Sequence, residues 1–292
     1  MRRPAAPKRE GRRRVLVAIA ALVLTLAAVE RALSQPPLQL RRATEASAEV
    51  AGPRGEADTP RPTSLSAQRQ GSASSTSARD TAPIDLTGYW VSYVTENWRY
   101  RMVTPAKGEY RRIPASPAAL PIIAAWDPAA DERAGEQCKS YGAGAIMSVP
   151  GRLHITWQDA NTLRIDTDAG TQTRLVRFTD GAPASTAPPT WQGESVGRWE
   201  RVPAPDTGGS LSVVTSRLRA GYLRKNGVPY SDRATVSEHF DVAPLPDGGQ
   251  LLLVNTIVAD PVYLNGPYIV SPHFKKESDG SKWDPTPCSS TW

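Results

Sequence analysis

Polar and apolar residues alternate with a period of two through the middle of the chain, between Arg152 and Phe178. Leu153–Trp157 and Leu163–Thr167 follow this pattern closely, and Thr171–Phe178 is rich in β-branched residues. Asp, Asn and Gly residues fill the two short gaps between these segments. Alternation interrupted by such turn residues predicts three antiparallel strands joined as a meander.

Further short segments with strand-like composition flank the meander on both sides. They are Leu86–Thr95, Trp98–Val103, Glu194–Arg201, Leu211–Arg217, Thr235–Phe240, Leu251–Val258 and Tyr268–Phe274. About ten strands at this spacing favour a mainly β fold, either an antiparallel up-and-down barrel or a strongly curved sheet.

One stretch has helical signals instead. Ser116-Pro117 and Asp127-Pro128 each place an N-cap residue before a proline at the first helical position. We therefore expect a short two-helix insertion, with helices over Ala118–Trp126 and Ala129–Gln137, across one end of the barrel.

The N-terminus carries the features of an export signal. Residues 1–34 hold 8 Lys or Arg and 2 Asp or Glu, and an apolar run follows the basic stretch at residues 15–29. Small residues, Ala32 and Ser34, precede a cleavage position, as in secretory signal peptides. An uncleaved anchor is the alternative, because the run is only slightly shorter than the ~17–25 residues that span a bilayer. We expect a periplasmic or secreted protein, anchored in the inner membrane through 15–29 if the leader is retained.

Charge and composition separate the rest of the chain into two parts. The formal net charge of +6 belongs to the leader, because the remaining residues hold 27 basic and 27 acidic side chains. A neutral remainder without a basic patch argues against a nucleic-acid partner. Residues 35–83 contain no aromatic residue and predict a disordered linker rich in Pro, Ser, Ala and Arg. All 20 aromatic residues lie in the expected β domain, residues 84–292.

Cys138 and Cys288 are the 2 cysteines of the chain. In an exported protein they predict one disulfide, and two free thiols are the alternative.

Gly193-Glu194-Ser195-Val196-Gly197 matches the G-x-S-x-G nucleophile motif of α/β-hydrolases. That motif needs a strand-to-helix turn, whereas the residues that follow here are strand-like. Ser195 with His239 or His273 nevertheless keeps a serine hydrolase open as an alternative function. The histidines lack the spacing of a metal site, and no cofactor-binding motif is present. We expect no metal and no cofactor.

The meander also presents a polar face, formed by His154 and Thr156 on one strand and by Arg164 and Asp166 on the next. If this face points into a barrel, it lines a polar pocket. If it points outward, which is the ordinary arrangement, it is a solvated surface.

Two resemblances add to this interpretation. Asp85-Leu86-Thr87-Gly88-Tyr89-Trp90 resembles the G-x-W signature that opens the first strand of lipocalin-like barrels. The resemblance implies that Gly88 and Trp90 are structural and that Trp90 closes one end of a lipocalin- or calycin-like barrel, often beneath a basic side chain.

The second resemblance covers residues 84–292 and is to a group of secreted bacterial proteins of unknown function. Its blocks occur in this order: Gly88-Tyr89-Trp90, Gly135–Cys138, Trp191–Glu200, Glu238-His239-Phe240, Asp260-Pro261, Tyr263, Pro267, His273–Lys276 and Gly280–Cys288. The chain departs from the group in a longer proline-containing insertion over Arg201–Gly209. The resemblance to that group implies no named activity.

Together these features favour a non-enzymatic binding module for a small apolar or amphipathic ligand. The expected ligand-binding residues are Trp90, Trp157, His154, Arg164 and Asp166. A structural envelope protein is a further alternative to the hydrolase that uses Ser195.

Overall fold

Residues 76–178, 186–201 and 208–291 are described by a computed structural model of the protein. The chain divides into two units, Met1–Arg69 and Gln70–Trp292. All the described residues belong to the second unit, so the expected leader, most of the expected linker and most of the insertion after Glu200 lie outside them. Among the described residues, none of the helices is both long and apolar enough to span a bilayer.

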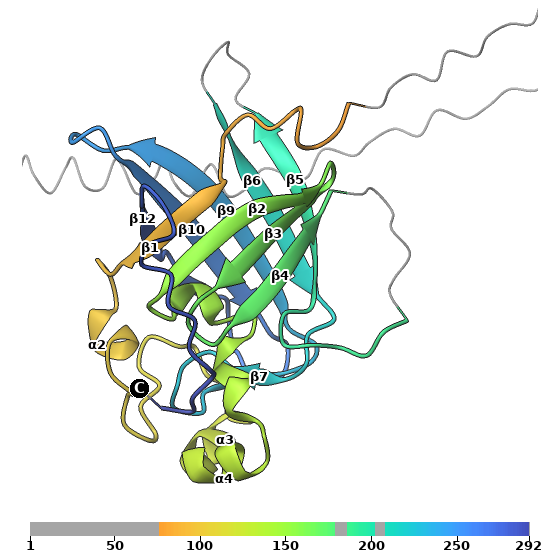
Figure 1. The fold of residues 1–292 in the computed structure, drawn as a ribbon. Helices are drawn as coiled ribbons and strands as arrows, with labels where there is room; N and C mark the ends of the chain where they lie inside the picture. The colour runs from red at the N-terminus through yellow and green to blue at the C-terminus, as the bar shows by residue number, and fades with distance from the viewer. Residues whose placement is uncertain (1–75, 179–185, 202–207, 292) are drawn as a thin grey trace, which may run out of the picture. The chain divides into compact units, whose positions relative to one another are not determined.

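Nine strands close into a barrel, so the predicted mainly β barrel is confirmed (Figure 1). Each strand pairs with the next in the following order, and the last, β9, pairs back with β10. The order is β10 (Gln250–Ala259), β12 (His273–Lys276), β1 (Gly88–Tyr93), β2 (Arg152–Asp159), β3 (Thr162–Thr167), β4 (Gln172–Arg177), β5 (Glu194–Arg201), β6 (Gly209–Ser216) and β9 (Thr235–Pro244). Outside the barrel wall, β11 (Tyr268–Val270) pairs with β10, and β7 (Gly221–Tyr222) pairs with β8 (Pro229–Tyr230).

One junction breaks the antiparallel pattern. Strands β4 and β5 pair in parallel through Val176↔Ser195 and Arg177↔Val196 only. Parallel neighbours need a crossover of about a dozen residues or more, and β5 begins at Glu194, well beyond the end of β4. The expectation of a wholly antiparallel up-and-down barrel is therefore wrong at this junction.

Two predicted strands also differ from the structure. Trp98–Val103 contains helix α2 (Trp98–Arg101) in place of a strand. Its six-residue alternation is too short to separate a strand from a helical turn, and Arg101 anchors the turn by donating from Nε to the carbonyl of Ser148. The predicted strand at Tyr268–Phe274 is divided between β11 and β12, because Pro272 cannot donate to a ladder.

The barrel interior is a packed core. Alternate residues of β2 and β3, such as Leu153, Ile155, Leu163 and Ile165, are buried, as the period-two pattern predicts. Fully buried Trp90, Phe240 and Phe274 lie in the same hydrophobic cluster. Apolar side chains therefore fill much of the barrel.

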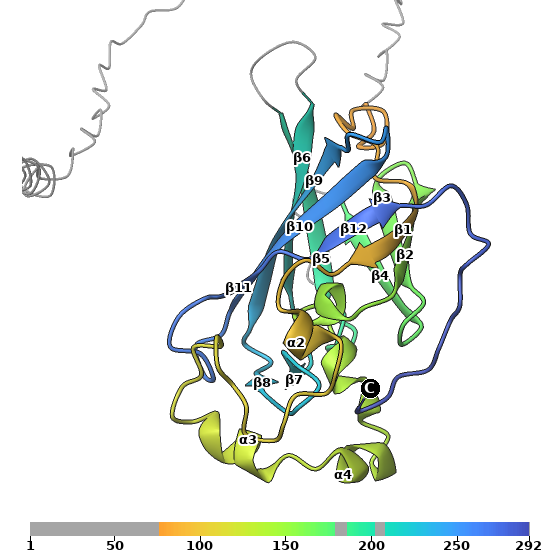
Figure 2. The same ribbon diagram turned by 90° about the vertical axis from the view of Figure 1, so that its left-hand side faces the viewer.

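Short helices and the β7–β8 sheet gather at one end of this barrel (Figure 2). The helices are α2, α3 (Leu120–Ala125), α4 (Pro128–Arg133) and two 3₁₀ turns, η1 (Gln137–Tyr141) and η2 (Ile146–Ser148). Asp127 caps α4 by accepting from the Ala129 amide at 3.0 Å, with Pro128 in the first turn. The expected two-helix insertion is thus present as α3 and α4.

A disulfide ties the C-terminal segment to this end of the molecule. Cys138 and Cys288 are bonded across a sequence separation of 150 residues, which confirms the predicted pairing. Two further bonds hold the segment: the Ser289 amide donates to the Tyr141 hydroxyl at 3.2 Å, and the Ser290 amide donates to Glu132 at 2.8 Å. The last described residues are therefore packed against the helical end.

Candidate functional site

Ser195, the nucleophile in the alternative hydrolase hypothesis, belongs to a polar cluster inside the barrel. Arg174 on β4 donates from Nε to Ser195 Oγ at 2.9 Å and from Nη2 to Thr215 Oγ1 at 2.8 Å. The same guanidinium forms a two-nitrogen ion pair with Glu238 on β9. All four side chains are buried. The cluster spans four strands of the barrel wall.

The two histidines considered for a triad lie elsewhere. His239 follows Glu238 on β9, so its side chain points to the opposite face of the strand, where Nδ1 lies 3.6 Å from Glu200 Oε2. Nδ1 of His273 on β12 is hydrogen-bonded to the Thr95 hydroxyl at 2.8 Å. A serine nucleophile needs a base within hydrogen-bond reach. Among the described residues, the groups hydrogen-bonded to Ser195 Oγ are Arg174 and Thr215.

Trp90, which the lipocalin resemblance singles out, is fully buried on β1. Its indole nitrogen donates to the Leu86 carbonyl at 2.9 Å, and Lys276 on β12 lies with Nζ 4.3 Å from the ring centroid. Burial lowers the pKa of Lys276, although Asp85 opposes this effect. Trp90 is therefore a packing residue with the cation of Lys276 over its face.

The polar face of the meander points outward. His154 stacks on Tyr89 with ring centroids 4.1 Å apart and meets Trp283 edge-on, on the outside of the barrel. Arg164 and Asp166 form a bidentate pair at 2.7 and 2.9 Å on the same outer surface. Of the two arrangements left open by the sequence, the structure has the solvated one.

Trp157 lies apart from these residues, near the end of β2. Its ring is 5.5 Å from Phe178 and 6.4 Å from Trp199, and Trp199 donates to the carbonyl of Ala78 at 2.8 Å. The five expected ligand-binding residues are thus distributed over the barrel interior, its outer face and one rim. The structure does not bring them together.

A basic pocket that the sequence reasoning missed lies at the helical end of the barrel. It contains three buried cations, Arg101 of α2 and the consecutive Arg224 and Lys225 between β7 and β8. Tyr100 and Tyr268 line the same pocket. The guanidinium carbon of Arg224 lies 4.2 Å from the Tyr100 ring centroid and 6.0 Å from that of Tyr268.

The two arginines of this basic pocket hold donors without acceptors. Arg101 is 4% exposed and Arg224 is 6% exposed. Neither Nη1 nor Nη2 of Arg101 makes a hydrogen bond among the described residues, and the same holds for Nη1 of Arg224. Glu96 lies 3.8 Å from Arg101 Nη1, close enough for an ion pair but too far for a hydrogen bond. The carboxylate of Glu96 therefore faces the guanidinium of Arg101 without a hydrogen bond to it.

Lys225 adds a third charge whose protonation is sensitive to the surroundings. Its Nζ donates to the Thr291 carbonyl at 3.2 Å and lies 4.6 Å from the Tyr141 ring centroid. Burial lowers the pKa of Lys225 to about 8, and the carboxylate of Glu132 opposes this shift. Burial likewise lowers the pKa of Arg101, against the attraction of Glu96. An added negative charge would stabilise all three cations.

The size of the basic pocket limits what it can hold. Its volume is about 30 Å³, above the ~10–15 Å³ that one water molecule requires. This suits a compact anion with several oxygen atoms, because each guanidinium presents a planar fork of donors to such a group. Among the described residues, no cluster of three or more His, Cys, Asp or Glu side chains is arranged to hold a metal ion.

No local sequence pattern indicates the basic pocket, and its mark at α2 is visible only in the structure. In Trp98-Arg99-Tyr100-Arg101-Met102 the buried side chain is Arg101, while Trp98 and Met102 are exposed. This inverts the ordinary relation between hydropathy and burial. The other two cations come from a distant turn, so no short motif links them.

Comparison of the chain with protein-family models, with curated proteins and with solved structures gives no match.

Proposed function

We propose that the protein is a binding module that holds a small oxyanion, of the phosphate, sulfate or carboxylate type, in the basic pocket. The observation that carries the proposal is the group of buried guanidinium donors of Arg101 and Arg224 that lack acceptors. Lys225 completes the set of cations around the cavity.

Buried guanidinium donors without acceptors are costly. A buried donor without a partner costs about 1–3 kcal/mol, and more when the group is charged. Three guanidinium nitrogens lack a hydrogen bond among the described residues, and Glu96 offsets the charge of Arg101 from 3.8 Å. An oxyanion with three or four oxygens supplies the missing acceptors and offsets the charge of the cations.

The location of the basic pocket changes the expected ligand class. The sequence favoured a small apolar or amphipathic ligand inside the barrel, but the interior holds the apolar core and the Arg174 cluster. A cavity of about 30 Å³ bounded by cations suits a polar group better than a hydrocarbon chain. We therefore propose that the barrel is the scaffold and that its helical end holds the ligand.

The proposed setting is the periplasm or the extracellular space of a bacterium. The Cys138–Cys288 disulfide supports an oxidising compartment, and the signal-like residues 1–34 support export. The Trp90–Lys276 stack supports a lipocalin-like character for the barrel.

The test is binding of inorganic phosphate, sulfate and acetate to the full chain. Calorimetric titration gives the Kd, and thermal unfolding at constant ionic strength, with chloride as reference, gives the stabilisation by mass action. Arg101→Met should weaken binding at least about tenfold, because it removes charge-assisted hydrogen bonds worth about 1.5–3 kcal/mol. Arg101→Lys keeps the charge but loses the planar fork of donors, so its Kd should lie between those of the wild type and Arg101→Met.

Arg198→Met is the matched control, because Arg198 is an exposed arginine on the outer face of β5. It should leave the Kd unchanged. The proposal fails if phosphate, sulfate and acetate stabilise the protein no more than chloride does, or if Arg198→Met weakens binding as much as Arg101→Met.

A further inference from the structure

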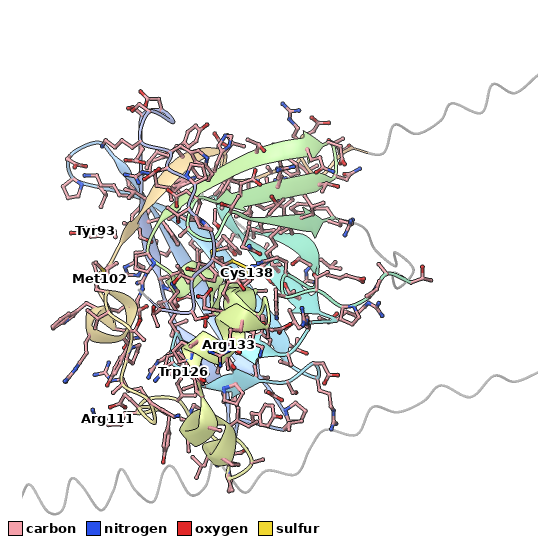
Figure 3. The ribbon with its side chains drawn as sticks, turned by 60° about the horizontal axis from the view of Figure 1, so that its bottom comes forward. Tyr93, Met102, Arg111, Trp126, Arg133 and Cys138 are labelled. Atoms are coloured by element: carbon pink, nitrogen blue, oxygen red, sulfur yellow. A yellow bond between two sulfur atoms is a disulfide. The ribbon has the colours of Figure 1, made fainter. Side chains whose placement is uncertain are left out.

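An exposed aromatic and basic surface lies over α2 and the loop that follows it. Trp98 is 68% exposed, and Tyr93, Met102 and Val103 are each more than half exposed. Tyr93, Met102 and Arg111 lie along one side of the molecule (Figure 3). We name this surface, formed by the exposed side chains of residues 93–112, the α2 patch.

The α2 patch contains a shallow groove as well as isolated side chains. Trp98, Arg99, Val103 and Arg111 all line a depression of about 460 Å³. Apolar and cationic side chains thus share one continuous surface. Clustered apolar exposure of this kind marks an interaction site more often than scattered single residues do.

Positive charge is concentrated in the α2 patch. Its exposed cations are four, Arg99, Lys107, Arg111 and Arg112, beside two Glu in residues 93–112, whereas residues 35–292 as a whole hold equal numbers of basic and acidic side chains. Both glutamates are engaged with arginines, Glu109 with Arg111 and Glu96 with Arg101. Exposed Arg99 and Lys107 make no ion pair among the described residues. The α2 patch is therefore positive on a domain that is otherwise negative.

We infer that the α2 patch docks on an anionic lipid bilayer, with Trp98 and Met102 entering the headgroup region and Arg99 and Lys107 contacting lipid phosphates. Trp is favoured at the boundary between water and hydrocarbon, because its ring is apolar and its N–H is polar. Each Lys or Arg near an anionic surface contributes about 1 kcal/mol. The charge complementarity selects an anionic bilayer over a neutral one. This inference is independent of the proposed oxyanion site, because it uses outward-pointing side chains.

The experiment uses the full chain with two kinds of vesicle, pure phosphatidylcholine and a mixture with about one-third phosphatidylglycerol. A fraction of the lipid carries bromine on the acyl chain, which quenches tryptophan only at close range. The apolar residues 15–29 can bind both vesicles, so the informative quantity is quenching of Trp98 itself. It is obtained as the difference between the wild type and Trp98→Phe.

We expect Trp98→Phe to remove at least half of the quenching that depends on anionic lipid, and Arg99→Glu to reduce that quenching severalfold. The controls are Trp283→Phe, on the outer barrel surface, and Arg198→Glu, an exposed charge reversal on β5. Neither control should alter the Trp98 signal. Because Trp98 and Arg99 are exposed, these variants should keep the unfolding midpoint of the wild type.

Several results would overturn the inference. Equal quenching of Trp98 in neutral and anionic vesicles would remove the role of charge, and no quenching of Trp98 in either would remove the bilayer. Self-association of the full chain that Trp98→Ala abolishes would show that a second copy covers the α2 patch instead. None of these outcomes bears on phosphate binding by Arg101, so the two proposals fail separately.

Discussion

Replacement of Glu238 by Gln is the sharpest test of what holds the barrel together. Glu238 is fully buried and Arg174 is 3% exposed, so the pair has little access to water. The Gln side chain keeps the shape of Glu but removes the negative charge. It leaves a buried guanidinium whose partners are all neutral, the Gln carbonyl oxygen and the hydroxyls of Ser195 and Thr215.

The expected loss in the free energy of unfolding is about 3–5 kcal/mol, the usual cost of leaving one charge of a buried pair uncompensated. The double variant Arg174→Met/Glu238→Leu should lose much less than Arg174→Met and Glu238→Leu lose together as single variants, because it removes both charges and leaves apolar atoms. Ser195 and Thr215 can still bond to each other at 2.8 Å. Their hydroxyls are therefore not left without partners.

Urea unfolding followed by circular dichroism measures these differences through the midpoint and the slope. Asp247→Asn is the matched control, because Asp247 pairs with Lys275 at 2.8 Å on the surface and should cost under ~1 kcal/mol. A loss for Glu238→Gln no larger than that for Asp247→Asn would show that the barrel does not need the charge of Glu238. A double variant as unstable as the sum of its two single variants would show that the two side chains do not stabilise the barrel as a pair.

Three further predictions concern the helical end and the serine. Relative to Lys225→Met, the wild type should gain up to about 3 kcal/mol of stability between pH 8 and 10.5, measured by urea unfolding. The reason is that the pKa of Lys225 is lowered to about 8 in the folded state, so the unfolded chain binds more protons in that window. A flat difference across the window would contradict this. Cys288→Ser should cost about 2–5 kcal/mol and expose the C-terminal segment to proteolysis, whereas an unchanged thermal midpoint would show that the disulfide is dispensable. Ser195 should resist a serine-directed phosphonate probe, because it is buried and bonded to Arg174; labelling that Ser195→Ala abolishes would favour the hydrolase.

The strands could be predicted from sequence wherever alternation and turn chemistry agree. The meander of β2, β3 and β4 has both, and β5 has the predicted bounds Glu194–Arg201. In these segments apolar residues are buried and polar residues are exposed in turn, so the local sequence pattern is enough to identify each strand. The strand-like residues after Ser195 were, for the same reason, a better guide to its position than the G-x-S-x-G motif.

The basic pocket could not be found in this way. Arg101, Arg224 and Lys225 are brought together by the closing of the barrel and by the packing of α2 against the β7–β8 turn. No local sequence pattern indicates that these three residues lie together, and a buried arginine resembles a surface one in sequence. Only the inverted burial of the α2 segment, with Trp98 outside and Arg101 inside, distinguishes it.

The Arg174 cluster lies across the parallel junction between β4 and β5. A closed barrel requires backbone hydrogen bonds between all neighbouring strands, and here β4 and β5 are joined through only two residue pairs. Arg174 reaches from β4 across that link to Ser195 on β5, Thr215 on β6 and Glu238 on β9. One side chain thus connects the strands where the backbone pairing is shortest. Loosening it should open the wall along this line first, and hydrogen exchange of the β4 and β5 amides would record that opening before the rest of the barrel responds.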